Sequence, residues 1–304
     1  MTVSNRTHVY VLSAALIMAV CLVPTLGAQR GGQEGAARGG GRGAAAPQAP
    51  AGPVPRLANG KPDLSGYWAN PYTPHMAARG VFDPATRQPL KFARQGEALP
   101  NAKAPASGGP RAYDLPYTPW GLDKWVTYDP VANGDYAGNC LPFGMSRNIN
   151  SPHGLQIVHH VDSLAFLFEQ DTWFHWVPLK PDFKWPADIP ESWNGVSTGK
   201  WDGDTLIIET SGFNGFTRLD TAGHPHSRQL KLTNTFKRLD SNTMEHTVTV
   251  HDPKTYTKDW MNVRTWRVKP ANEVIMEYSC NENNLRSLLD GSIKVWQYPD
   301  DVDK

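Results

Sequence analysis

The chain has 304 residues, of which 30 are lysine or arginine and 29 are aspartate or glutamate, so its formal net charge is +1. Because positive and negative charges nearly cancel and no basic stripe is present, the chain has no overall electrostatic field that would attract it to nucleic acid or to an anionic membrane. Eleven tryptophans, with ten tyrosines and ten phenylalanines, favour a β-rich core or an aromatic-lined binding site.

The first 28 residues follow the order of a secretory signal peptide. Arg6 supplies the positive start, an apolar stretch runs from residue 9 to residue 23, and small residues precede a cut after Ala28. The apolar stretch is shorter than the ~20 residues of a membrane-spanning helix. We therefore expect cleavage, a periplasmic or secreted protein and no stable membrane span; an uncleaved anchor is the alternative.

Cleavage would also remove Cys21 and leave Cys140 and Cys280 as the two remaining cysteines. Disulfides persist in the oxidising compartments outside the cytoplasm. We therefore predict a disulfide between Cys140 and Cys280, with two buried free thiols as the alternative.

Composition divides the rest of the chain. Residues 29–59 are mainly glycine, alanine, proline and arginine, which predicts a disordered linker because such a segment cannot bury enough surface to offset the entropy of ordering. Residues 60–304 are predicted to form one β-rich domain. Within it, frequent proline and glycine from residue 71 to residue 119 predict a long irregular segment. Thr118-Pro119 is typical of a helix start.

The second half alternates with a period of two, the pattern of half-buried strands. Short turns at Val161-Asp162 and Gln170-Asp171 divide three such runs into a predicted meander. Because each turn contains two residues, alternate residues of all three runs lie on the same side of the sheet. That set is Leu155, Ile157 and His159, then Leu164, Phe166 and Phe168, then Trp173, His175 and Val177.

The strongest hairpin signal is Trp201-Asp202-Gly203-Asp204. Asp-Gly tolerates the positive φ angles of a tight turn. Leu206 and Ile208 are then expected on the core side of the following strand.

Two longer turns set further registers, at residues 240–242 and 270–272. Around the first turn, the apolar residues of the two strands lie on the same side of the sheet when Phe236 opposes His246 and Leu232 opposes Val250. Around the second turn, they do so when Trp266 opposes Met276 and Arg264 opposes Tyr278. At least eight antiparallel strands connected in order predict an all-β fold. It would be a single antiparallel β-barrel, calycin-like, or a two-sheet sandwich, with the long irregular segment near its N-terminus.

Six segments between residues 60 and 284 form a recognisable set: GKPDLSGYW (60–68), NCLPFGMSR (139–147), GKWDGDTL (199–206), GFN (212–214), GHPHS (223–227) and DPKTYT (252–257). Together they resemble a large family of uncharacterised exported bacterial proteins. The resemblance implies export and a single β-rich domain. The family has no established activity, so the resemblance assigns no catalytic residue to this chain.

One histidine pair stands out as a metal candidate. His224 and His226 flank a proline, with Asp220 just upstream, and zinc and copper sites use such ligands. No strict ligand spacing accompanies the pair, and a polar loop explains the same residues. His224 and His226 are therefore weak metal candidates, and no cofactor is expected.

A secreted hydrolase or lyase is one alternative function. Its general base would be His226 or His246, beside a carboxylate from Asp220 or Glu209. Residues 195–199 have the Gly-x-Ser-x-Gly letters of a nucleophile elbow, but they run into a predicted strand without a following helix. No nucleophile is therefore predicted.

The predicted registers bring polar residues to the apolar faces of the strands. Buried polar groups cost free energy unless they are paired or hydrated. They could line a cavity and orient a ligand over aromatic walls, or they could satisfy one another, with Arg264 reaching outward over Trp266. The candidate ligand-binding residues are Asn234, His246, Arg264, Trp266, Tyr278 and His175.

The function that the sequence favours is an exported β-barrel that binds a small aromatic or sugar-like ligand in an internal or mouth cavity. The alternatives are the hydrolase or lyase, and an envelope structural or interaction module tethered by the linker. No nucleic-acid partner is expected, and the sequence does not define the oligomeric state.

Overall fold

The computed structural model describes residues 50–99, 111–299 and 302. The predicted signal peptide at 1–28 and residues 29–49 of the predicted linker lie outside the described residues. The remaining linker residues contact the folded domain. Arg56 forms an ion pair with Asp204 at 2.7 Å, and the backbone N–H of Gly52 donates to Ser241 Oγ at 2.7 Å.

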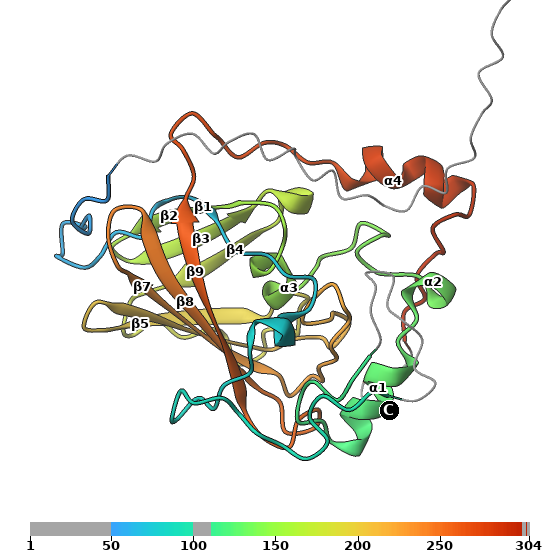
Figure 1. The fold of residues 1–304 in the computed structure, drawn as a ribbon. Coiled ribbons are helices and arrows are strands. Elements are labelled where there is room, and N and C mark those ends of the chain that lie inside the picture. Colours follow the sequence, from blue (N-terminus) through green and yellow to red (C-terminus); the bar gives the residue numbers. More distant parts are fainter. Residues whose placement is uncertain (1–49, 100–110, 300–301, 303–304) are drawn as a thin grey trace, which may run out of the picture. The chain divides into compact units, whose positions relative to one another are not determined.

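Nine strands form one antiparallel sheet (Figure 1). Their inward residues alternate with outward ones, as in β3, where every second residue of Ser163–Phe168 is buried. The strands are β1 Gly66–Ala69, β2 Leu155–His160, β3 Ser163–Phe168, β4 Phe174–Pro178, β5 Val196–Asp202, β6 Thr205–Ser211, β7 Lys231–Arg238, β8 Thr243–His251 and β9 Trp260–Val268.

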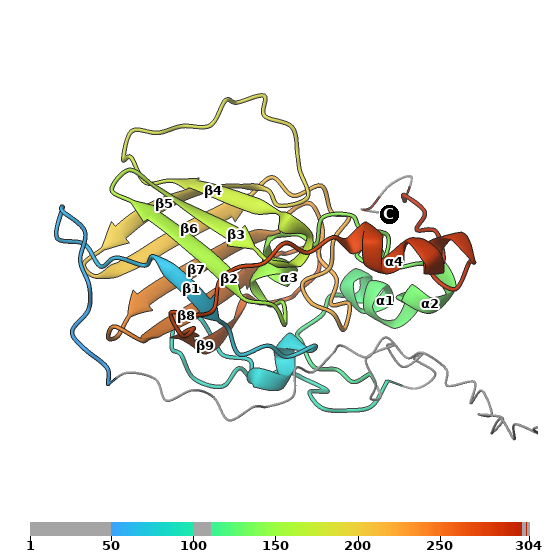
Figure 2. The same ribbon diagram turned by 90° about the horizontal axis from the view of Figure 1, so that it is seen from above.

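The sheet closes almost completely into a barrel (Figure 2). Its strand order is β4-β3-β2-β1-β9-β8-β7-β6-β5, so β1 joins the meander β2–β4 to the meander β5–β9. The two ends of this order, β4 and β5, pack against each other. The predicted all-β class is therefore confirmed, and the barrel, not the sandwich, is the correct alternative.

The predicted registers of the two meanders are confirmed. In the first, Ile157 opposes Phe166, and Phe166 opposes His175. In the second, Phe236 opposes His246, as expected from the apolar faces. The turn between β3 and β4 is longer than predicted because it contains the 3₁₀ helix η2, Gln170–Thr172.

The predicted hairpin between β5 and β6 is also present, but its two-residue turn lies one residue later than predicted, at Gly203-Asp204 and not at Asp202-Gly203. Asp202 opposes Thr205, so Gly203 and Asp204 are the two central residues of the turn. Gly203 has φ +55°, a conformation that residues with a Cβ adopt reluctantly. Leu206 and Ile208 are fully buried inside the barrel, as expected.

The predicted hairpin after β9 is wrong. Residues 270–279 form no strand, and Tyr278 does not oppose Arg264. The edge of β9 is instead occupied by β1, where Trp68 opposes Val268 and the N–H of Lys269 donates to the carbonyl of Tyr67. A short strand more than 190 residues upstream in the chain therefore takes the place of the predicted neighbour.

One end of the barrel carries the helices (Figure 1). The connection from β1 to β2 returns to the same end and contains the 3₁₀ helix η1 Met76–Arg79 and helices α1 Pro119–Thr127, α2 Pro130–Asn133 and α3 Met145–Ile149. Thr118 caps α1 as predicted, since its side chain accepts from the N–H of Gly121 at 3.1 Å. We call this the helical end of the barrel; the loops 212–230 and 252–259 also belong to it.

The predicted disulfide is present. Cys140, after α2, is bonded to Cys280, the first residue of α4 Cys280–Leu289. The bond holds the C-terminal segment against the helical end. Among the described residues, no helix combines the length and apolar character needed to cross a membrane.

Candidate functional site

The predicted ligand-binding residues of the strands face the barrel interior. His175, Asn234, His246, Arg264 and Trp266 are all buried. His246 Nε2 donates to Asn234 Oδ1 at 2.9 Å, and its ring stacks on Phe236 with centroids 4.6 Å apart. This pairing and stacking fill the middle of the barrel with side chains.

The interior nevertheless keeps polar atoms without partners. Asn234 Nδ2, His246 Nδ1 and Trp266 Nε1 are buried and make no hydrogen bond to any described residue. Burial, and then the nearby charge of Arg264, lower the pKa of His246 well below its usual value, so its ring is neutral.

Arg264 does not reach outward over Trp266, as one interpretation of the sequence proposed. Its guanidinium is buried and donates to Asn262 Oδ1 at 3.1 and 3.3 Å. Burial and the neighbouring Arg79 lower the pKa of Arg264 to about 10. Within the described chain Arg264 has no carboxylate partner at ion-pair distance.

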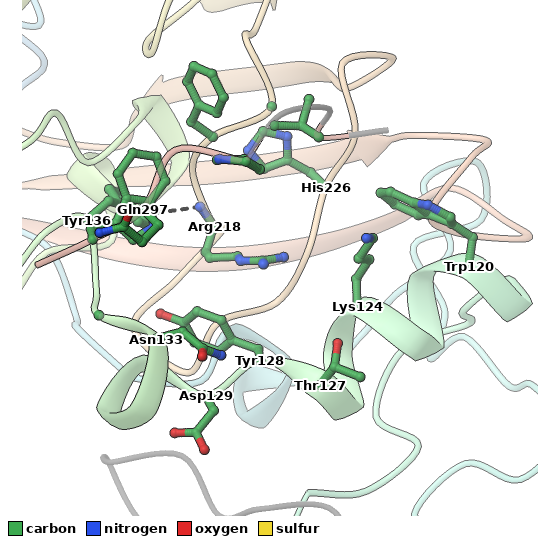
Figure 3. Close-up of a pocket in the computed structure, with 16 residues that line it drawn as sticks. Trp120, Lys124, Thr127, Tyr128, Asp129, Asn133, Tyr136, Arg218, His226 and Gln297 are labelled. Atoms are coloured by element: carbon green, nitrogen blue, oxygen red, sulfur yellow. Dashed lines mark hydrogen bonds between the residues drawn. The ribbon is translucent and has the colours of Figure 1, made fainter. Parts of the chain in front are cut away.

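A cavity of about 260 Å³ lies at the helical end, outside the barrel interior (Figure 3). Its wall combines α1 and the residues that follow it with the loop from Gly215 to His226 and the C-terminal segment from Trp296. We call this the mouth pocket. Aromatic rings from all three parts line it: Trp120, Tyr128, Tyr136, Phe216 and Trp296.

Two basic side chains extend into the mouth pocket. Lys124 comes from α1 and Arg218 from the loop, and Figure 3 shows both side chains extending into the space, with the end of Arg218 directed toward the side of Lys124. Arg218 lies over the ring of Tyr128 at 4.8 Å, and Lys124 lies 5.5 Å from the ring of Trp120. Neither forms an ion pair with a described carboxylate, whereas Asp129 in the wall caps α2 through the N–H of Ala132. The described wall of the pocket therefore carries two positive charges, from Lys124 and Arg218, one negative charge, from Asp129, and several aromatic ring faces.

His226, a predicted general base, forms part of the pocket wall. Its Nδ1 donates to the carbonyl of Ser227 at 2.9 Å, and its Nε2 lies 2.6 Å from Thr217 Oγ1. Both ring nitrogens are thus engaged by the protein itself.

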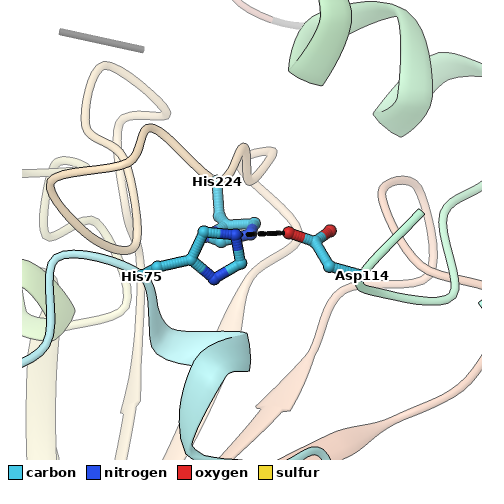
Figure 4. Close-up of side chains that lie close together, drawn as sticks. All are labelled: His75, Asp114 and His224. Carbon is cyan, nitrogen blue, oxygen red and sulfur yellow. Dashed lines mark hydrogen bonds and ion pairs between the residues drawn. The ribbon is translucent and has the colours of Figure 1, made fainter. Parts of the chain in front are cut away.

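His224, two residues earlier, belongs to a different site (Figure 4). Its Nδ1 lies 2.6 Å from Asp220 Oδ2, and its Nε2 lies 2.8 Å from Asp114 Oδ2. His75 Nε2 also lies 2.8 Å from Asp114 Oδ2. The two histidines therefore do not form the joint metal pair considered from the sequence, and His224 pairs with His75 instead. We call His75, Asp114 and His224 the His-Asp cluster.

The charges of the His-Asp cluster are strongly coupled. Burial alone would lower the pKa of His224, but the carboxylates of Asp220 and Asp114 raise it to about 10. Burial would raise the pKa of both carboxyl groups, but the nearby His224 lowers both below their usual range. The N–H groups of Met76, Gly223 and His224 also donate to Asp220.

The predicted pairs of catalytic residues are not the ones that the structure brings into contact. Asp220 binds His224 and not His246, which lies inside the barrel beside Asn234. Glu209 lies on the outer face of β6 and pairs with Lys200 at 3.3 Å. Glu209 is therefore separated from the buried His246 by the barrel wall.

The sequence prediction missed the charged residues and the second histidine of these sites, His75, Asp114, Lys124 and Arg218, as well as the aromatic residues of the mouth pocket. His75 and Asp114 lie in the segment predicted to be irregular, and no spacing connects them with His224. Lys124 and Arg218 come from a helix and a loop that only the folded chain brings together. Comparison of the chain with protein-family models, with curated proteins and with solved structures found no match.

Proposed function

We propose that this chain is an exported β-barrel protein that binds a small anionic ligand, with an aromatic or sugar-like ring, in the mouth pocket. The observation that carries the proposal is the pair Lys124 and Arg218, whose charges extend into the pocket without a described carboxylate partner. A cation in a cavity loses hydration, and an anionic ligand restores the lost interactions.

The walls of the pocket define the rest of the ligand. Tyr128 and Trp120 present ring faces beside the two cations, and Trp296 covers the side formed by the C-terminal segment. Flat apolar surfaces of this kind suit the face of an aromatic or sugar ring. A volume of about 260 Å³ matches a ligand of one ring.

Export is part of the proposal. The disulfide between Cys140 and Cys280 supports it, because disulfides persist mainly outside the cytoplasm. The charged start and apolar stretch of the first 28 residues support it independently.

Titration with simple probes tests the binding. Benzoate and glucuronate carry the proposed charge, and benzyl alcohol and glucose are their neutral counterparts. Both anions should quench the fluorescence of the pocket tryptophans at lower concentrations than the neutral compounds. Lys124→Gln and Arg218→Gln should each weaken anion binding about tenfold or more, since a hydrogen bond to a charged group contributes about 1.5–3 kcal/mol.

Lys200→Gln is the matched control, because Lys200 is exposed on β5 and paired with Glu209, away from the pocket. Its affinity for both anions should equal that of the wild type. Equal affinity for charged and neutral probes, or wild-type affinity in both pocket variants, would contradict the proposal.

A further inference from the structure

The His-Asp cluster has the donor set and the convergence of a metal centre. Its side chains come from three distant segments: His75 from the residue before η1, Asp114 from the chain before α1, and His224 from the loop between β6 and β7. His75 Nε2 and His224 Nε2 each lie 2.8 Å from the same oxygen, Asp114 Oδ2, and the three atoms lie within 4.8 Å of one another. Figure 4 shows the three side chains directed at one point.

We propose that His75, Asp114 and His224 bind a divalent metal ion of the zinc type. Two imidazole nitrogens and one carboxylate oxygen are the ligands of many such sites, whereas Mg²⁺ and Ca²⁺ prefer oxygen alone. The site goes beyond the proposed anion binding and does not depend on it.

The residues around the cluster orient its ligands. Asp220 holds Nδ1 of His224 at 2.6 Å, which directs Nε2 into the cluster. An ion bound at Nε2 replaces the proton that Nε2 donates to Asp114, so metal binding releases a proton. The Tyr117 hydroxyl donates to Asp114 Oδ1 at 2.7 Å and leaves Oδ2 to face the two histidines. Trp125 stacks on the His224 ring with centroids 4.4 Å apart and an interplanar angle of 14°. A carboxylate behind a ligating histidine is a common companion of metal sites.

Two of the three distances between the ligand atoms need only a small adjustment to accept an ion. Ligand atoms about 2.0–2.1 Å from a tetrahedral ion lie about 3.3 Å apart, so the two distances of 2.8 Å must each widen by about 0.5 Å. His224 is fully buried, but the side chain of His75 is 35% exposed and can move outward.

Metal titration of the untagged full-length chain, stripped by a chelating resin, tests the site. Calorimetry should show one equivalent of Zn²⁺ bound per chain. Co²⁺ should give the intense visible absorption of a tetrahedral site, and Zn²⁺ should abolish it. Absence of stoichiometric binding to the wild-type chain would overturn the proposal without any variant.

Variants locate the ion. His75→Ala and Asp114→Asn remove a ligand and should weaken Zn²⁺ binding at least 100-fold, and Asp220→Asn, which removes a positioning group, should weaken it about 10- to 100-fold. His251→Ala is the matched control, because His251 also pairs with an aspartate, Asp259, at 2.7 Å, but on the surface. Wild-type affinity in both His75→Ala and Asp114→Asn would overturn the assignment.

The test separates this site from the mouth pocket. Lys124→Gln and Arg218→Gln should bind Zn²⁺ like the wild type, whatever their effect on benzoate and glucuronate. Where Asp114→Asn folds poorly by circular dichroism, His75→Ala decides, because its side chain is partly exposed and its loss leaves no large buried cavity.

Discussion

His175 Nε2 lies 2.6 Å from Ser197 Oγ and joins the two strands at which the sheet order begins and ends. His175 belongs to β4 and Ser197 to β5, and both are buried. Ser197 Oγ also forms a hydrogen bond with Thr210 Oγ1 on β6, at 2.7 Å. A chain of side-chain hydrogen bonds therefore crosses the seam where no backbone ladder connects the barrel.

This contact predicts a pH-dependent stability. Burial lowers the pKa of His175 to about 4, whereas in the unfolded chain the pKa is near 6.5. Between these values the unfolded chain binds more protons, so stability falls as pH drops from about 6.5 to about 4. The loss from this residue amounts to about 3 kcal/mol at most.

The measurement is urea denaturation of the wild type and of His175→Gln from pH 4 to pH 7.5. Glutamine does not titrate and keeps a polar end near Ser197. The difference in unfolding free energy between the two proteins should change in favour of the variant as pH falls. A difference that stays constant with pH would show that His175 does not titrate in this range.

The β5–β6 turn predicts a large effect of one glycine. Gly203 has φ +55° and no atom within 4 Å of a Cβ built on it, so conformation and not crowding decides the result. Gly203→Val should lower the free energy of unfolding by about 1 kcal/mol or more, because a β-branched residue resists positive φ. Gly203→Asn is the control and should lose much less, since asparagine tolerates this conformation. Equal losses in the two variants would argue against a conformational cause.

The Asn234–His246 hydrogen bond predicts coupled mutational effects. Removing one partner strands the other in the barrel interior, so Asn234→Leu and His246→Leu should each cost about 1–3 kcal/mol. The double variant should cost clearly less than the two single variants together, as measured by thermal melts in a double-mutant cycle. Unchanged melts in both single variants would instead favour a hydrated cavity that tolerates either change.

The Cys140–Cys280 disulfide predicts a dependence of stability on oxidation. Closing a loop of 140 residues contributes about 4–5 kcal/mol in the chain-entropy model. The double variant Cys140→Ser/Cys280→Ser should therefore melt at a lower temperature than the oxidised wild type. Reductant should lower the melting temperature of the wild type and leave the variant unchanged. Two freely alkylated thiols in exported wild-type protein would contradict the pairing.

Local patterns explain why most of the barrel could be predicted. Period-two alternation and turn residues such as Gly203 lie within a few residues of the strands they define, and the Phe236–His246 register follows from matching two neighbouring apolar faces. The β1–β9 pair has no such local signal. Trp68 and Val268 are distant in the sequence, so their pairing depends on how the whole chain folds and not on a local sequence pattern.

The sites were less predictable for the same reason. His75, Asp114 and His224 come from segments without periodicity, and their contact is a property of the loops at the helical end. The residues predicted from strand faces, such as His246 and Arg264, are indeed inside the barrel, because facing direction is a local property. The partner of each depends on neighbours from other strands, as the hydrogen bond of His246 on β8 with Asn234 on β7 illustrates.

The position of β1 between β2 and β9 also sets an order of events during folding. Hairpins such as β5–β6 and β7–β8 join neighbouring residues and can form early, within microseconds. The Trp68–Val268 pair must close a loop that contains both meanders, and such non-local pairings slow the search for the native state. We therefore expect the meanders to be structured in the transition state and β1 to dock late, so that substitutions in β1 accelerate unfolding and leave the folding rate almost unchanged.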